Sequence, residues 1–209
     1  RRQRQMCIRD SNGTIYDSED ITSLSFDSGS ISGETYQIGS TYMNSVKIVF
    51  PSIIESIKED IEVIPELAIL LEGEYQYTKL GHFFVSEFDR DRNSNKTTIT
   101  ANDKMMYMES VFESKLTYPK PYREVALEIA NLSGVEVNQA SFSSLGISSI
   151  AKPEGYTYRQ AIGLIAQFEG GFASFNRDGE LEIRRLAPTS FEVTPELSLI
   201  HISEPTRPY

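Results

Sequence analysis

The spacing of apolar residues changes once along this chain of 209 residues, and the change limits the folds open to it. From about residue 21 to residue 100, apolar and polar residues alternate, or β-branched and aromatic residues cluster, as they do in β-strands. From residue 122 onward, apolar residues instead recur at intervals of three and four, as on one face of an α-helix. The sequence therefore predicts an α+β fold whose strands precede its helices.

Strand composition is clearest in the first half of the chain. We expect strands at residues 35–38, 45–50, 74–77, 83–88 and 97–100. The last two flank a polar loop, residues 89–95, and this arrangement predicts a hairpin. Residues 53–71 are ambiguous, because their Glu and Lys spacing also suits a helix. Pro65 would break a helix that crossed it, so we expect a strand, most clearly at residues 61–64.

Two helices are expected in the second half. The first begins at Pro121 and ends at Gly134. Its apolar face comprises Tyr122, Val125, Ala126, Ile129 and Ala130. The second begins with a capping box of Thr157 and Gln160 and stops at Gly170. Its apolar face comprises Tyr158, Ala161, Ile162 and Ile165. An Asp-Gly turn at residues 178–179, between two strand-like runs, then predicts a second hairpin.

Both ends of the chain resemble translated sequencing adapters. Residues 1–10 match one reading frame of a transposase-type adapter, and residues 197–207 match its partner on the opposite strand. We therefore expect residues 1–10 and 197–209 not to be native, and the rest to be a fragment of a longer protein. Removing four Arg and one Asp at the first end, and one Arg and one Glu at the second, leaves 15 basic and 28 acidic residues, a net charge of −13.

Charge and composition exclude several classes of protein. The acidic balance argues against binding to a nucleic-acid backbone, which needs clustered Lys and Arg, and the basic residues 1–4 belong to the adapter-like start. The single cysteine, Cys7, excludes an intramolecular disulfide framework and a Cys-rich zinc site. No apolar run approaches the length of a membrane span, so we expect none.

The first hairpin loop carries acidic residues in the order of a calcium loop. Asp89, Asp91 and Asn93 occupy its first, third and fifth positions. An EF-hand loop also needs Gly at position six and Glu at position twelve, where this chain has Ser94 and Thr100. The flanking segments are strands rather than helices, so a solvated turn is the expected structure.

Residues that carry catalysis are sparse. His82 is the sole His outside the adapter-like ends, and no Gly-x-Ser-x-Gly sequence accompanies it, so we expect a packing or interface role. The pairs Asp89/Asp91 and Glu59/Asp60 have the chemistry of a general acid and base, but 28 acids produce such pairs by chance. We therefore expect no catalytic residue, no metal ligand and no cofactor site.

Several short sequences follow one another in a recognisable order between residues 25 and 186. They are a Gly-x-Tyr-x-Ile-Gly-like turn at 33–39, Ser-Val-Lys-Ile at 45–48, Leu-Gly-His-Phe-Phe-Val at 80–85, Thr-Ile-Thr-Ala-Asn-Asp-Lys-Met at 98–105, Tyr-Pro at 118–119, Tyr-Arg-Gln-Ala at 158–161, Ala-Ser-Phe at 173–175 and Asp-Gly-Glu-Leu at 178–181. This order resembles the N-terminal part of tail-tip proteins of long-tailed phages and prophages. These proteins are called minor structural protein, tail-associated lysin or baseplate hub.

The resemblance implies a domain order and a set of partners. It implies a barrel-like, β-rich hub domain over residues 11–108, a helical insert over 109–170, and the start of a second β domain over 171–196. Related hubs are trimers that join the tail tube to receptor-binding or peptidoglycan-degrading parts. We therefore expect a homotrimer in the phage virion, made in the bacterial cytoplasm. Its partners would be the distal tail protein, the tail tube and receptor-binding or fibre proteins, and DNA would pass an acidic channel without specific binding.

Two other functions stay open. A peptidoglycan hydrolase or endopeptidase of the tail would use His82 with scattered carboxylates. We instead expect no catalysis in this fragment, and any lytic activity in a missing C-terminal module. A carbohydrate- or receptor-binding module would expose aromatic residues on a sheet face, and the candidates are Tyr75, Tyr77 and Phe83.

Overall fold

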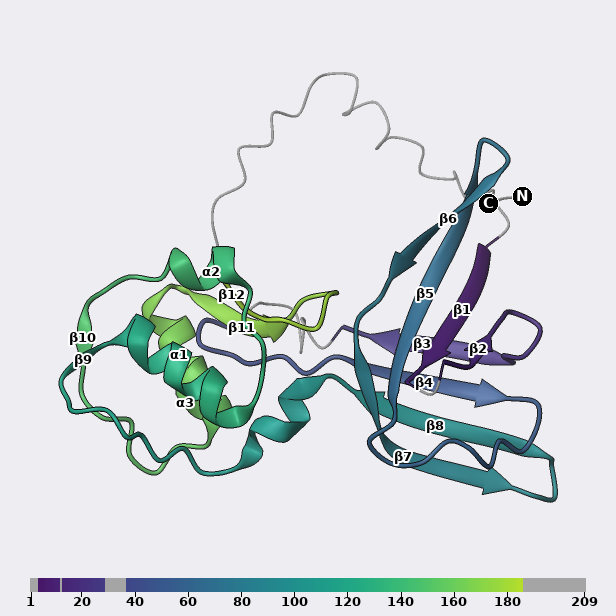
Figure 1. The fold of residues 1–209 in the computed structure, drawn as a ribbon, viewed down its shortest axis with the longest axis horizontal. Helices are drawn as coiled ribbons and strands as arrows, with labels where there is room; N and C mark the ends of the chain where they lie inside the picture. The colour runs from purple at the N-terminus through teal and green to yellow at the C-terminus, as the bar shows by residue number, and fades with distance from the viewer. Residues whose placement is uncertain (1–3, 12, 29–36, 186–209) are drawn as a thin grey trace, which may run out of the picture.

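The protein has two lobes, which lie beside each other in Figure 1. The structure, a computed structural model, describes residues 4–11, 13–28 and 37–185. The sheet lobe comprises strands β1 to β8, and the helical lobe comprises everything from residue 104 to residue 185. The segment 37–43, which we call the linker, contacts the helical lobe and leads into β4. The mixed strand and helix content agrees with the predicted α+β class.

An eight-stranded antiparallel sheet forms the sheet lobe. Its strands are β1 Arg4–Asp10, β2 Ile15–Tyr16, β3 Ser23–Asp27, β4 Ser45–Phe50, β5 Glu62–Leu71, β6 Glu74–Lys79, β7 Phe83–Asp91 and β8 Lys96–Asn102. They are arranged in the order β2-β1-β5-β7-β8-β4-β3, and β6 pairs with the outer half of β5. The predicted strands at 45–50, 74–77, 83–88 and 97–100 are confirmed. Of the strand expected at 35–38, residues 35 and 36 lie outside the described residues, and residue 38 is in a turn.

The sheet is open, so the barrel-like expectation is not met by the described strands. The reason lies in β5, which pairs with β7 only at Glu62 and Val63 and then pairs with β6 from Glu66 onward. The sheet branches at this change of partner instead of curling back on itself. Pro65 lies at the branch, where its missing N–H interrupts no ladder with β6 or β7. Pro65, which argues against a helix in this segment, is therefore compatible with a strand.

Alternation of side chains builds the core of the sheet lobe. Val46, Ile48 and Phe50 of β4 point inward, and the residues between them are more exposed. Ile99 on β8 and Phe83 on β7 are also buried in this core. The sheet lobe therefore has one apolar face of its own, as the period of two predicts.

The adapter-like residues include strand β1. Residues 4–10 pair with β5 along their whole length, and Ile8 is fully buried opposite Pro65. Main-chain hydrogen bonds hold such a strand, and almost any sequence supplies them, so the pairing does not bear on the origin of these residues. The adapter origin of residues 1–10 stays a prediction, and residues 197–209 lie outside the described residues.

The helical lobe packs helices against a two-stranded ribbon. Its elements are the 3₁₀ helix η1 Lys104–Glu109, β9 Lys120–Pro121, α1 Tyr122–Ser133, α2 Gln139–Ser143, β10 Ser149–Ile150, α3 Tyr158–Phe168, β11 Gly171–Phe175 and β12 Leu181–Arg185. All five residues of the predicted apolar face of α1 are buried. The capping box of α3 is formed by Thr157 and Gln160, and the hairpin after α3 is β11–β12. These predictions are confirmed.

The ribbon β11–β12 shares one core with the helices. Ala173 and Ile183 from the ribbon pack in the same cluster as Ile129 of α1 and Ile162 of α3. The linker pairs with the free edge of β11 through Thr41, and Val137 pairs with the free edge of β12. The ribbon thus forms one side of the core of the helical lobe. The expectation of a second β domain over residues 171–196 stays a prediction, because residues 186–196 lie outside the described residues.

Candidate functional site

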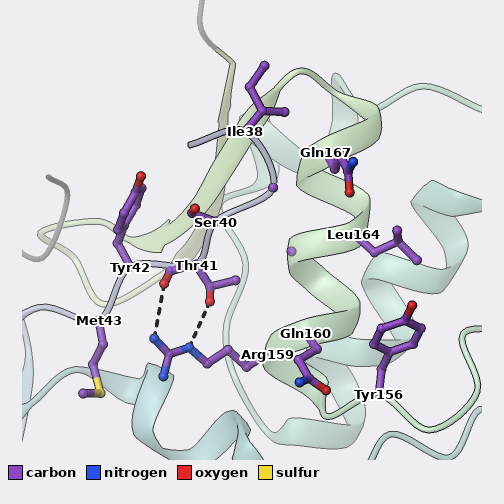
Figure 2. A pocket seen from close by; sticks show the side chains of 12 residues that line it. Ile38, Ser40, Thr41, Tyr42, Met43, Tyr156, Arg159, Gln160, Leu164 and Gln167 are labelled. Atoms are coloured by element: carbon purple, nitrogen blue, oxygen red, sulfur yellow. Dashed lines mark hydrogen bonds between the residues drawn. The ribbon is translucent and has the colours of Figure 1, made fainter. Parts of the chain in front are cut away.

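A groove of about 580 Å³ runs between the linker and α3 (Figure 2). Ile38, Tyr42 and Met43 line it from the linker, Leu164 lines it from α3, and Tyr156, which precedes α3, also lines it. It combines apolar side chains with polar ones, among them the charged side chain of Arg159. It lies between two segments that are far apart in the sequence, residues 38–43 and 156–167.

Arg159 fastens the linker to α3. Its Nε donates to Thr41 Oγ1 at 2.9 Å and its Nη2 donates to the Thr41 carbonyl at 3.2 Å (Figure 2). Its Nη1 pairs with Glu109 Oε1 at 2.6 Å, at the end of η1. All three guanidinium nitrogens are therefore engaged within the protein. This arginine acts as a structural clamp rather than as a charge offered to a ligand.

Two glycines bring the linker into contact with the helix backbone. A Cβ at Gly163 would lie 2.6 Å from the Gly39 carbonyl oxygen, which is closer than packed atoms allow. Gly39 itself has a φ of +83°, a conformation that favours glycine. The wall of the groove therefore depends on the absence of a side chain at Gly163. Sequence reasoning placed Gly163 inside a helix but gave no sign of this contact.

The residues that line the groove carry little reactive chemistry. No carboxylate, His or Cys lines it along the described residues. The Gln160 side chain already accepts the Thr157 amide at 3.0 Å, and Tyr42 packs edge-on against Phe172 with ring centroids 5.1 Å apart. Acid–base or nucleophilic catalysis needs such groups in reach of one another. The groove is therefore suited to contact with a partner rather than to catalysis.

His82 lies at the junction of the two lobes. Its Nδ1 is 2.8 Å from Glu62 Oε1, and its side chain packs closely against Gly179 in the turn between β11 and β12. Lys79 and Asp178 approach to 4.0 Å at the same place. The hydrogen-bonding partner of His82 at this junction is a carboxylate rather than a hydroxyl or thiol nucleophile. The geometry agrees with an interface role.

The calcium-like loop is a turn that binds its own backbone. Asp91 Oδ1 accepts the Asn93 amide at 2.9 Å, and its Oδ2 accepts the Ser94 hydroxyl at 2.6 Å. Hydrogen bonds from Ser94 and then from the Asn93 amide lower the pKa of Asp91. Asp89 lies on β7 opposite Thr98. Across the described part of the chain, no three His, Cys, Asp or Glu side chains gather in a way that could hold a metal ion.

The other sequence candidates are separated by the fold. Asp60 accepts the Tyr107 hydroxyl at 3.0 Å, in a contact between the sheet lobe and η1. Phe83 is 1% exposed and belongs to the core of the sheet lobe, so the suggestion that it is an exposed aromatic is wrong. Tyr77 is 52% exposed on β6, whereas Tyr75 is half-buried. Of the three candidates, only Tyr77 is therefore exposed, so they do not form a shared aromatic surface.

A cluster of polar side chains lies where α3 ends, around Glu169. Glu169 accepts the Gly146 amide at 2.7 Å and the Tyr122 hydroxyl at 2.5 Å, and it pairs with Arg185. Burial by itself raises the pKa of Glu169, but these three hydrogen bonds outweigh it and lower the pKa. The cluster holds α3, the α2–β10 loop and β12 together. Its partners are all satisfied, as in a structural network.

Comparison with known proteins shows which proteins have a similar fold. No protein-family model matches the chain, and no curated protein matches it. A 43 kDa tail protein of prophage MuSo2 from Shewanella oneidensis has a similar structure, with a TM-score of 0.57 and 15% identity over 90% of this chain and 57% of that one. A tail protein from Neisseria meningitidis MC58 gives 0.56 and 12%, over 90% and 53% of the two chains. Prophage tail protein gp18 from Listeria monocytogenes EGD-e gives 0.51 and 11%, over 87% and 50%.

The chain therefore has the α+β fold of phage and prophage tail proteins. It spans between 50% and 57% of the length of these three structures. Within the described residues, no helix combines the length and the apolar character that crossing a bilayer requires.

Proposed function

We propose that this protein is a structural component of a phage tail, and that within the tail it serves as a hub at the tip. In that position it joins the tail tube to receptor-binding or cell-wall-degrading parts. The observation that carries the proposal is the likeness in fold to tail proteins along 87–90% of the chain. One fold can serve several functions, so the experiments below test the role itself.

The outermost strands of the described sheet support assembly with neighbouring subunits. β3 ends the described strand order, β6 pairs with the outer half of β5, and neither strand contains a proline. Phe26 on β3 and Tyr77 on β6 are 40% and 52% exposed. Such edges suit a closed ring of identical subunits, and we propose a homotrimer. The distal tail protein, the tail tube and fibre or receptor-binding proteins are the proposed partners in the virion.

The acidic charge of the chain supports the proposal that DNA passes without binding to it. A net charge of −10 for the whole chain repels a phosphate backbone, so DNA crossing the ring would meet no adhesive surface. We propose that this chain has no catalytic activity, since the groove holds no acid–base pair and His82 is paired with Glu62. Neither a peptidoglycan hydrolase nor a carbohydrate-binding module is favoured by a specific observation.

The test is genetic and uses the phage or prophage that encodes the full gene. Deleting the gene is expected to abolish complete tails in electron micrographs, and an antibody against this chain is expected to label the tail tip of intact virions. Infectious particles with normal tails after deletion would overturn the proposal, as would labelling that is absent from virions.

A second arm separates structure from catalysis. A gene carrying His82→Ala, Asp89→Ala and Asp91→Ala is expected to restore tails and plaque counts to within a few-fold of wild type, because none of the three side chains is proposed to react with a substrate. The purified chain should leave peptidoglycan in a gel intact. Clearing of the gel by wild type but not by the triple variant would favour a hydrolase.

A further inference from the structure

Two passages of the chain between the lobes lie side by side at one rung of the sheet. The linker leads into β4 at Ser45, and β8 leaves the sheet at Asn102, the residue that is paired with Ser45. The pairing continues one residue further, because the Asp103 amide donates to the Asn44 carbonyl at 3.0 Å. These two passages therefore cross the joint between the lobes as a ribbon of two strands.

Asp103 and Asn44 hold this ribbon together. Asp103 Oδ2 accepts the amide and the side-chain Nδ2 of Asn44, each at 2.8 Å, and its Oδ1 accepts the Met105 amide at 3.0 Å. The Asp103 side chain is buried, and these donors are all N–H groups, which suit an ionised carboxylate. Because the bonds lie within a few residues of the rung, they can stay intact while the angle between the lobes changes.

The rest of the linker belongs mechanically to the helical lobe. Arg159 binds the side chain and the carbonyl of Thr41, and the Tyr42 amide donates to the Ala173 carbonyl of β11 at 2.9 Å. Bending is therefore confined to the start of β4 and the end of β8, and hinges commonly lie at the ends of such elements. The two lobes have cores that share no residue, so each can keep its packing while the angle changes.

One contact between the lobes lies on the face of the sheet that points away from its core. Phe84 of β7 follows the buried Phe83, so its side chain lies on the opposite face of the sheet. The Tyr107 ring of η1 packs edge-on against Phe84, with centroids 5.6 Å apart, and the Tyr107 hydroxyl donates to Asp60 at 3.0 Å. We call this the outer contact.

The other face of the sheet carries a cavity of about 170 Å³ between the lobes. Phe26 and Leu80 line it from the sheet lobe, and Asn176, in the turn between β11 and β12, lines it from the helical lobe. Phe26 packs edge-on against Phe83 with centroids 6.0 Å apart, and Leu80 packs against the same core. The cavity is therefore on the core face, opposite the outer contact.

A second contact between the lobes lies beside this cavity. The turn between β11 and β12 points from the helical lobe towards the sheet lobe (Figure 1), and there Gly179 packs against His82 while Lys79 lies 4.0 Å from Asp178. The ion pair is exposed, and such pairs contribute little to stability. The hydrogen bond of His82 is made to Glu62 within the sheet lobe, so it does not join the lobes. We call this the inner contact.

We infer that the helical lobe rocks against the sheet lobe about the rung of Ser45 and Asn102, and that the outer and inner contacts hold it at its present angle. A ribbon of two strands bends more easily out of the plane of the sheet than within it, because bending within the plane would stretch one strand against the other. The two contacts lie on opposite sides of that plane, so a change of angle that opens one closes the other. The cavity gives space for movement in one direction. The inference concerns the movement of the lobes and does not rest on the tail role.

Distances between pairs of spin labels in the full chain measure this movement. The labels are attached to pairs of exposed residues changed to Cys, with Cys7→Ser as the background. Thr78→Cys with Arg177→Cys spans the inner contact, and Glu59→Cys with Ser110→Cys spans the outer contact. Rocking predicts that a variant changes the two distances in opposite directions.

Variants that weaken one contact at a time give the direction. Tyr107→Phe keeps the ring and removes the hydrogen bond to Asp60, so a population with a longer outer distance and a shorter inner distance is expected to grow about two- to tenfold relative to the original one. His82→Ala weakens the inner contact and should produce the reverse, a longer inner distance and a shorter outer one. Tyr77→Phe, a change of an exposed tyrosine on β6, is the matched control and should leave both distances as in wild type.

The signs of the changes decide the outcome. Opposite changes in the two distances, reversed between Tyr107→Phe and His82→Ala, would support rocking about the rung. Lengthening of both distances together would mean that the lobes separate instead, and it would overturn the inference. Distances that stay the same in both variants would show a rigid joint and would overturn it as well, as would a response of Tyr77→Phe equal to that of Tyr107→Phe.

Discussion

At the scale of single residues, the contact between linker and helix depends on Gly163. An alanine there raises helix propensity by about 1 kcal/mol, but its Cβ would lie 2.6 Å from the Gly39 oxygen. Because that neighbour is backbone, the linker has to shift, and overpacking of this kind costs about 1–3 kcal/mol. We expect Gly163→Ala to lower the free energy of unfolding, measured in urea, and to raise hydrogen exchange at the Tyr42 amide. Stabilisation by the full propensity gain, with Tyr42 exchange unchanged, would show that the backbones are not in contact.

At the scale of elements, α3 begins because Thr157 and Gln160 satisfy each other's backbone amides, at 3.2 Å and 3.0 Å. The helix forms one wall of the groove, so its first turn positions Arg159. Thr157→Ala removes one cap bond and is expected to lower the free energy of unfolding by about 1 kcal/mol, with a lower Tm. Thr157→Ser keeps the hydroxyl and should stay within a few tenths of a kcal/mol of wild type. Equal losses in the two variants would attribute the effect to the Thr157 methyl group instead.

At the scale of the whole molecule, the two lobes have separate cores. Ile162 is buried in the helical lobe and Ile48 in the sheet lobe, and their two clusters share no residue. Truncating either to alanine should cost about 2–5 kcal/mol. We expect Ile162→Ala to speed hydrogen exchange mainly in α1 and α3, and Ile48→Ala to speed it mainly in β4 and β8. If each variant speeds exchange equally in both lobes, the protein unfolds as one cooperative unit and the joint is stronger than its contacts indicate.

Elements with local causes were predictable. The apolar face of α1, the capping box of α3 and the Asp-Gly turn of β11–β12 each depend on residues within a few positions of one another. Strand pairing was harder. The register of β1 on β5 joins segments about 60 residues apart, and the local pattern fixes only which face of a strand is apolar, not which strand it pairs with at Pro65. For the same reason the pattern could not decide whether the sheet closes, and the described strands form an open sheet.

The sequence by itself determined the class of fold, the periods of its two halves and the starts and ends of its main helices. Only the tertiary structure decided that Arg159 reaches Thr41 across 118 residues and that Asp103 reaches Asn44 across 59. Local patterns arise from the conformational preferences of neighbouring residues. Contacts such as these depend instead on where two lobes come to rest, because burying apolar surface fixes the packing first, and the polar side chains at the joint then find the partners that this packing brings within reach.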